Sequence, residues 1–193
     1  DEHGAKPWKW FKFLALTDSG YLLIETDTGV VTINPHAARE RIAFERLSFE
    51  QTPSQTLLIP ETVKLSPTDA ARLTAALPVI ESFGFKVEAF GADTFKIDAV
   101  PQLIGALPPA AVMTTIARDL AEGGARRSGR WREELIAKSI ARSFAGSALK
   151  LNPEGATKLV EDLAACKMPY VCPRGKPIMI FTSTRELDRK FAK

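Results

Sequence analysis

Residues 29–47 read GVVTINPHAARERIAFERL, and this stretch sets the pattern of the whole fold. Its first part, 29–33, is rich in β-branched residues and predicts a short strand. Asn34 and Pro35 then mark a helix start. The asparagine oxygen accepts a hydrogen bond from an early helical N–H, and a proline at the first position has no N–H to leave unpaired. We therefore expect a strand that passes directly into a helix ending near Phe49.

Helix starts of the same kind recur along the chain. They are expected at Ser66-Pro67, at Asn152-Pro153 and at the Ser183–Glu186 capping box. The helices that follow are predicted at 67–83, 109–122, 131–145 and 153–166, and Pro78 predicts a kink or break. Further strands are predicted at 11–16, 21–25, 57–65, 85–90, 94–100 and 178–182. Strands and helices mix without a regular strand–helix–strand alternation, so the predicted fold class is α+β.

The composition is that of a globular protein. The 193 residues are 45% hydrophobic and 25% charged, which allows one sizeable domain or two small ones. A formal net charge of +3 permits contact with nucleic acid without requiring it. Cys166 and Cys172 fit no disulfide framework, and no signal peptide or apolar run of about 18 residues is present. We expect a cytoplasmic piece of a longer protein, with no membrane association.

Two stretches carry residue types that bind metals. On a helix, His36 and Glu40 share one face, and their spacing of four is able to hold a metal ion. The alternative is a capped surface helix with ion pairs such as Arg41 with Glu45. Cys172 lies in a Pro/Gly-rich loop, where the alternative is a structural turn with a free thiol. Zinc needs about four ligands, so spacing alone favours the helix and the turn.

Two other stretches suggest contacts with macromolecules. Residues 55–60, QTLLIP, place a glutamine before an aliphatic run, which is typical of short peptides that dock into apolar pockets. The alternative is a buried strand that ends at its proline. Arg126, Arg127 and Arg130 lie in the glycine-containing stretch 123–130, a linker candidate, and are candidates for contact with DNA phosphates.

Taken in order, these motifs resemble the C-terminal domain of the MutL family of DNA mismatch-repair proteins, over nearly the whole chain. Residues 34–45 fall where family endonucleases carry Asp-Gln-His-Ala-x-x-Glu-x-x-x-x-Glu. Residues 172–177, CPRGKP, resemble the late family motif Cys-Pro-His-Gly-Arg-Pro. QTLLIP resembles the segment through which family members engage the replication sliding clamp. The resemblance thus implies clamp contacts by Gln55, Leu57, Leu58, Ile59 and Pro60.

The same resemblance implies that the endonuclease site has decayed. Asn34 stands where the family has an aspartate, Ala141 falls on a ligand cysteine, and Arg174 replaces a histidine ligand. A divalent metal needs several donors and charge compensation, whereas a guanidinium is a permanent cation. We therefore expect no bound metal and no working catalytic group. The remnants of the site are His36, Glu40, Glu45 and Cys172.

By resemblance, residues 1–54 and 132–193 form a discontinuous dimerisation subdomain, and residues 55–131 form an inserted external subdomain. The implied function is homodimerisation together with binding of the sliding clamp, mismatch-recognition proteins and downstream repair proteins. No cofactor is expected here, because ATP and magnesium belong to an N-terminal ATPase domain of the parent protein, which also contacts DNA. The alternative function is a metal-dependent DNA-nicking endonuclease that uses the remnant residues.

Overall fold

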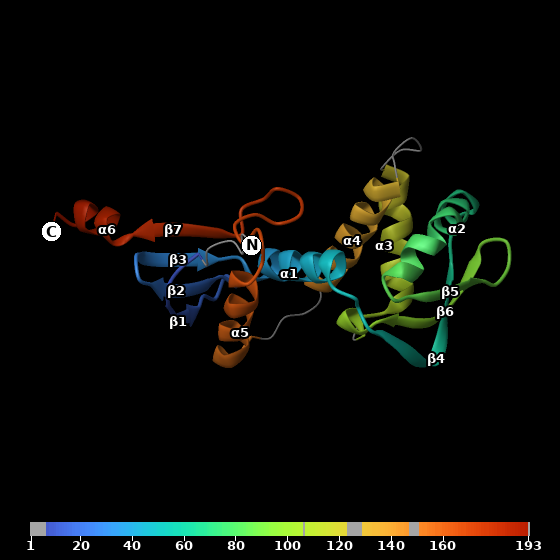
Figure 1. The fold of residues 1–193 in the computed structure, drawn as a ribbon, viewed down its shortest axis with the longest axis horizontal. Coiled ribbons are helices and arrows are strands. Elements are labelled where there is room, and N and C mark those ends of the chain that lie inside the picture. The colour runs from blue at the N-terminus through green and yellow to red at the C-terminus, as the bar shows by residue number, and fades with distance from the viewer. Residues whose placement is uncertain (1–6, 106, 123–128, 147–150, 193) are drawn as a thin grey trace. The chain divides into compact units, whose positions relative to one another are not determined.

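The computed structural model describes residues 7–105, 107–122, 129–146 and 151–192 (Figure 1). The strands are β1 (Phe11–Leu16), β2 (Leu22–Thr26), β3 (Gly29–Ile33), β4 (Ser54–Lys64), β5 (Lys86–Ala89), β6 (Thr94–Pro101) and β7 (Met179–Ser183). The helices are α1 (Pro35–Phe49), α2 (Pro67–Ser82), the 3-10 turn η1 (Gln102–Ile104), α3 (Pro109–Glu122), α4 (Gly129–Ala145), α5 (Pro153–Ala164) and α6 (Thr184–Lys190). The strands form two antiparallel sheets, ordered β1-β2-β3-β7 and β4-β6-β5. The expected α+β class is therefore confirmed.

The expected helix starts are confirmed by their hydrogen bonds. Asn34 Oδ1 accepts from the backbone N–H groups of His36 and Ala37, at 3.1 and 3.2 Å. The caps of α2, α5 and α6 have the same geometry, with Ser66 accepting from Asp69, Asn152 from Gly155 and Ser183 from Glu186. Each side chain satisfies an N–H that has no partner within its own helix.

Helix α2 continues through Pro78 without the local break that this proline predicts. Ala70, Leu73, Ala76 and Ile80 of α2 are all buried in one core, and they lie on both sides of the proline. Packing therefore holds the two halves of the helix together, although Pro78 removes one backbone donor. No helix in the described part of the chain is long and apolar enough to span a membrane.

The chain separates into two compact units. Unit 1 comprises residues 1–42 and 148–193, and unit 2 comprises residues 43–147. The pattern is discontinuous, as the resemblance implies, but the boundaries differ from those at 54/55 and 131/132. The reason is packing: the second half of α1 and most of α4 contribute buried residues to the same core as α2 and α3. The functional assignment of the two subdomains stays a prediction.

In unit 1, the four-stranded sheet is covered on one face. Leu22 and Ile24 of β2 and Val31 and Ile33 of β3 are buried together with residues of α1 and α5 (Figure 1). Because side chains alternate along a strand, the residues between them point to the opposite face. The covered face is thus the core of unit 1.

In unit 2, α2, α3 and α4 contribute to one core together with the sheet β4-β6-β5. A buried polar network joins two of these helices. The Asp119 carboxylate of α3 accepts a hydrogen bond from Ser139 Oγ at 2.5 Å and another from Arg142 Nη2 at 2.6 Å, both from α4. Charge-assisted hydrogen bonds of this kind fix geometry as well as charge. They join α3 to α4 within unit 2.

Candidate functional site

The carboxylate of Glu40 lies in the interior of unit 1. Helix α1 places Glu40 on its covered face, and only 3% of the side chain is exposed. Its Oε2 accepts a hydrogen bond from Arg174 Nη2 at 2.8 Å. Its Oε1 is buried and has no hydrogen-bond partner among the described residues. Glu40 is therefore a buried carboxylate with Arg174 as a counter-charge.

The loop that follows α5 supplies this counter-charge. Cys172 is buried in the core of unit 1, and Arg174 follows two residues later with 46% of its side chain exposed. Hydrogen bonding to Glu40, then the charges of Glu40 and Cys172, raise the pKa of Arg174 above its ordinary value against the opposing effect of burial. Arg41 of α1 also binds the loop, because its Nε donates to the Val171 carbonyl at 2.7 Å. Two arginine contacts thus connect α1 to this loop.

These residues do not fit a divalent metal. The Arg174 guanidinium lies against Glu40, the carboxylate that a metal would need most. The side-chain oxygen of Asn34 is already engaged in capping α1. Within the part of the chain that the structure describes, no three His, Cys, Asp or Glu side chains are grouped as a metal site. A divalent ion requires several donors grouped together, and a permanent guanidinium beside one of them opposes its binding.

The other residues at the family's metal-site positions, which were expected to be remnants or losses of a decayed site, lie in different surroundings. His36 is exposed in the first turn of α1, whereas Glu45 is buried near the end of the same helix. Ala141 is buried in the core of unit 2, where it packs as an apolar residue of α4. The contact of Arg41 with Val171 was not expected, because no local sequence pattern indicates a bond between residues 130 positions apart.

Replacing Arg174 by alanine should destabilise the protein by about 2 kcal/mol or more. Breaking a buried ion pair costs several kcal/mol, and the half-exposed position of Arg174 reduces that figure through solvent screening. The double substitution Arg174→Ala with Glu40→Gln should recover most of the loss, because a neutral amide needs no counter-charge. Urea unfolding measures both variants. Equal instability of the single and double variants would instead attribute the loss to packing of the arginine stem.

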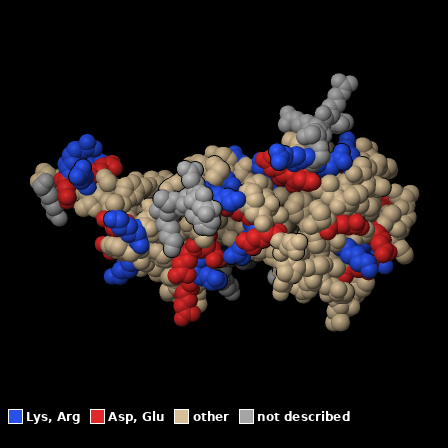
Figure 2. All heavy atoms as spheres, in the orientation of Figure 1, with Lys and Arg blue, Asp and Glu red and all other residues tan. Residues whose placement is uncertain are grey.

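The stretch QTLLIP lies in β4, one of the two edge strands of the three-stranded sheet. Gln55 and Thr56 pair with β6, and pairing resumes at Glu61. Between them, residues 57–60 lie opposite a single β6 residue, Asp98, so this part of β4 loops away from the sheet. At the end of unit 2 that holds β4 in Figure 1, Figure 2 shows basic and acidic side chains next to each other, with uncharged surface beside them. The segment is therefore extended and anchored at both ends.

The side chains of this loop divide into two groups. Leu58 is 98% exposed and Ile59 is 77% exposed, whereas Leu57 packs against the core of unit 2. Gln55 and Pro60 are also exposed. Of the five residues expected to contact the clamp, four are therefore exposed to a partner. The fifth, Leu57, packs against the core of unit 2. The alternative of a buried strand is wrong, because a buried strand would hide its aliphatic side chains.

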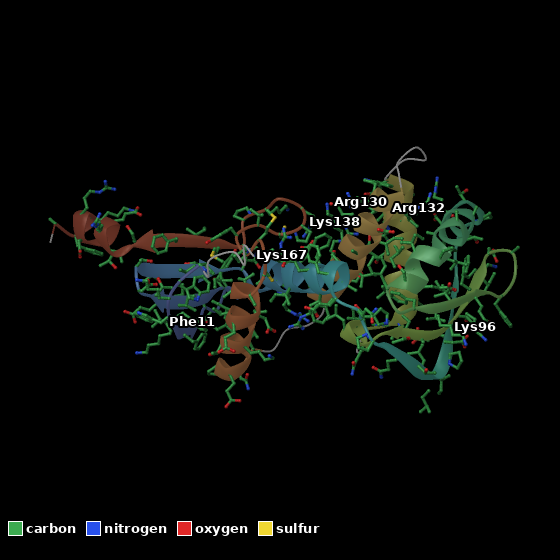
Figure 3. The ribbon with its side chains drawn as sticks, in the orientation of Figure 1. Phe11, Lys96, Arg130, Arg132, Lys138 and Lys167 are labelled. Atoms are coloured by element: carbon green, nitrogen blue, oxygen red, sulfur yellow. The ribbon has the colours of Figure 1, made fainter. Side chains whose placement is uncertain are left out.

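The expected DNA-contacting arginines are only partly described. Arg126 and Arg127 lie outside the described residues. Arg130 is exposed near the start of α4, whereas Arg132 and Lys138 of the same helix are half-buried (Figure 3). The cations of this helix alternate with its acidic residues: Glu133 and Glu134 line the same cleft as Arg130, and Lys138 pairs with Glu134 at 2.7 Å. The described surface of α4 is mixed in charge and not a basic patch.

The second face of the unit 1 sheet carries apolar side chains beside polar and charged ones, because the row that holds Val30 also contains Glu25 and Thr182. Leu23 of β2 pairs with Thr32 of β3, which pairs with Ile180 of β7, so these three form one row across the sheet. Val30 lies in the next row on the same face. Among the described residues, Leu23, Thr32 and Ile180 are not part of the hydrophobic core of unit 1. Ile180 is 67% exposed. We call this surface, residues Leu23, Val30, Thr32 and Ile180, the open sheet face.

The open sheet face was missed in the sequence analysis. Its signal is present, because strands that are apolar at consecutive positions, as in residues 22–24 and 179–181, have apolar side chains on both faces. Reading that signal correctly requires knowing that β7 pairs with β3, across about 150 residues of chain. Uncovered apolar side chains on a sheet face mark a surface that another protein covers.

Comparison with known proteins agrees with this geometry. The family model described as the MutL C terminal dimerisation domain matches residues 14–147. The chain belongs to this family. The match omits β7 and the first half of β1, and it covers α1, the looped part of β4 and the core of unit 2. Membership of a dimerisation-domain family implies that the chain forms a homodimer.

Three relatives bear the same name, DNA mismatch repair protein MutL. The chain is 34% identical to the protein of Akkermansia muciniphila over 185 residues, which are 94% of this chain and 29% of that protein. It is 34% identical to the protein of Syntrophobacter fumaroxidans over 89% of this chain and 26% of that protein. It is 30% identical to the protein of Methanothrix thermoacetophila over 90% of this chain and 31% of that protein. The chain thus spans less than a third of the length of these MutL relatives.

Proposed function

We propose that this MutL C-terminal domain joins two protein chains and presents a binding segment for the sliding clamp, without cutting DNA itself. One observation carries the proposal: Leu58 and Ile59 are almost fully exposed in a loop of β4 that is anchored at both ends. Isolated exposed aliphatic residues are common, but two adjacent ones that follow an exposed glutamine form a peptide-recognition pattern. Titration of the purified chain with the clamp, alongside a measurement of its oligomeric state, tests both parts.

The open sheet face is the proposed dimer interface. Because the family forms dimers and this face carries uncovered apolar side chains, a second copy of the chain is its natural partner. A two-fold interface uses the same surface on both copies, so the sheets would face each other across the axis. A stable interface of this kind buries about 1,200–2,000 Å² in total. The exposed edge of β7 lies at the margin of the same face.

The clamp contact is proposed for Gln55, Leu58, Ile59 and Pro60. An extended segment suits a partner groove, because alternate side chains enter apolar pockets while the backbone stays accessible. Leu57 supports the segment from beneath, because it packs against the core of unit 2. A short linear anchor of this size binds with micromolar or weaker affinity, about 8 kcal/mol or less. Two such segments in a dimer would increase the apparent affinity.

The domain is proposed not to be a nuclease, because Arg174 holds the Glu40 carboxylate. The purified dimer should contain no stoichiometric manganese or zinc, and it should not nick supercoiled plasmid in the presence of manganese. Metal content and nicking are measured on the same sample, with Glu40→Ala as the matched variant. Nicking that disappears in Glu40→Ala would contradict this proposal and establish the alternative, a metal-dependent endonuclease. In the alternative, His36, Glu40, Glu45 and Cys172 would be the site.

The remaining assignments concern the longer protein. The relatives extend well beyond the matched region, and we assign ATP and magnesium binding to an N-terminal part of the parent protein. Contacts with DNA, with mismatch-recognition proteins and with downstream repair proteins are proposed for the whole protein in the cytoplasm. For this domain, the proposal assigns no cofactor. Arg130 is retained only as a subsidiary DNA contact, because its surroundings are mixed in charge.

A further inference from the structure

The side chain of Gln55 lies against a glycine. Gly105 ends the turn η1, and a Cβ atom built on it would lie 2.7 Å from Gln55 Oε1. Real Cβ atoms essentially never approach another heavy atom so closely, so any larger residue at this position would displace the glutamine amide. The backbone does not itself require glycine, because Gly105 has φ −55° and ψ −17°, an ordinary right-handed conformation. Glycine thus matters here for the space that it leaves to Gln55.

The other end of the loop is fixed by Glu61. Its Oε2 accepts a hydrogen bond from the backbone N–H of Ala110, in the first turn of α3, at 3.3 Å. A carboxylate at a helix N-terminus is favoured by the helix dipole and by the N–H groups that lack partners there. Glu61 is also the residue at which β4 resumes pairing with β6. Both ends of residues 55–61 are therefore held by the same corner of unit 2, from η1 to the start of α3.

We propose that Gly105 and Glu61 are positioning residues that hold residues 55–60 in a preformed, binding-ready conformation. This inference rests on the proposed clamp function. Gly105 leaves the space that the Gln55 amide occupies, and Glu61 fixes the point at which the loop returns to the sheet. Neither residue needs to touch the partner. The binding segment is then a rigid element of the fold and not a flexible peptide.

A preformed segment binds more tightly than the same residues in a free peptide. Ordering a backbone costs free energy for each residue, and a fixed conformation removes most of that cost from the binding step. The intact domain should therefore bind the clamp at least about tenfold more tightly than a synthetic peptide of residues 54–62. Equal affinity of peptide and domain would overturn the idea of a preformed segment.

A double-mutant cycle tests the role of Gly105. Gly105→Ala should weaken clamp binding by about tenfold in the wild-type background and have no effect in a Gln55→Ala background, because its action passes through the glutamine. Gly146→Ala is the matched control: this glycine lies in the same unit, and a Cβ there would have its closest neighbour at 3.4 Å. An equal loss in both backgrounds, or no loss in either, would overturn the proposed role of Gly105.

Glu61 is tested by a graded pair of substitutions. Glu61→Gln keeps an oxygen that accepts from Ala110, so it should retain most of the clamp affinity, whereas Glu61→Ala should lose about as much as Gly105→Ala. Equal losses in the two Glu61 variants would show that the hydrogen bond is not what positions the loop. Thermal unfolding of both variants accompanies the titration, so a general loss of stability is recognised separately.

A second readout separates this inference from the proposed function. In NMR spectra of the uniformly labelled chain, the Gln55 side-chain amide should show a contact with Gly105 and shift in the Gly105→Ala variant. If the chain fails to bind the clamp while this shift is seen, the clamp function is wrong and the positioning of Gln55 stands as a structural fact. If the amide behaves like that of a free glutamine, the positioning itself is wrong.

Discussion

Replacing Gln55 and Leu58 together by alanine should abolish binding to the sliding clamp and leave the dimer intact. Leu58 is almost fully exposed in the free domain, so its transfer into a partner pocket gains about 1.5–3 kcal/mol. Losing that burial and the hydrogen bonds of the glutamine amide removes a large share of a total of about 8 kcal/mol or less. The dissociation constant should therefore rise at least about a hundredfold, beyond the range of a micromolar titration.

The matched control for this experiment is Ile180→Ala. Ile180 is also an exposed aliphatic residue of an edge strand, but it belongs to unit 1 and to the open sheet face. It should leave the intrinsic affinity of the clamp segment unchanged. The two loop residues should not alter folding either, because neither Gln55 nor Leu58 belongs to a buried core. Unchanged clamp binding in the Gln55/Leu58 variant would remove the proposed contact altogether.

Replacing Ile180 by glutamate should convert the dimer to a monomer at micromolar concentration. In a two-fold interface each substitution occurs twice, so two new carboxylates would be buried on the open sheet face or near its axis. An unpaired buried charge costs several kcal/mol, and like charges add to that cost. We expect the dimer to dissociate at least about a hundredfold more readily, which sedimentation equilibrium or light scattering measures directly.

Here the control is Ile59→Glu, which places the same charge on an equally exposed isoleucine of the other unit. It should leave the dimer unchanged and weaken clamp binding, the reverse of the pattern for Ile180. Measuring dimerisation and clamp binding for both glutamate variants therefore distinguishes the proposed dimer interface from the proposed clamp-binding segment. A dimer that survives Ile180→Glu would exclude the open sheet face and direct attention to another surface of the domain.

Local elements of this fold were predictable because their signals are local. The caps at Asn34, Ser66, Asn152 and Ser183 each depend on a hydrogen bond to a residue two or three positions away. Strands such as 11–16 and 29–33 follow from β-branched and aromatic residues between turn residues. Pro78 is the exception, because the buried residues around it outweigh its preference for a break.

The candidate site was predictable only in part. The resemblance to the family predicts which ligand positions have changed, but only the structure shows that Arg174 binds Glu40 across 134 positions of sequence. Similarly, QTLLIP was visible as a motif, whereas the inward position of Leu57 and the proximity of Gln55 to Gly105 were not. These contacts depend on which parts of a chain meet in space, and a single sequence does not encode that in any local pattern.

By itself, the sequence determined the α+β class, the helix starts and the membership of a mismatch-repair family, because propensities, caps and ordered motifs are written in neighbouring residues. Only the tertiary structure decided three further points. Leu58 and Ile59 are exposed, and the open sheet face is not covered by the described residues of unit 1. The Arg174 guanidinium donates a hydrogen bond to the buried carboxylate of Glu40. Burial and charge pairing arise from long-range packing, so they are settled when the chain folds and not before.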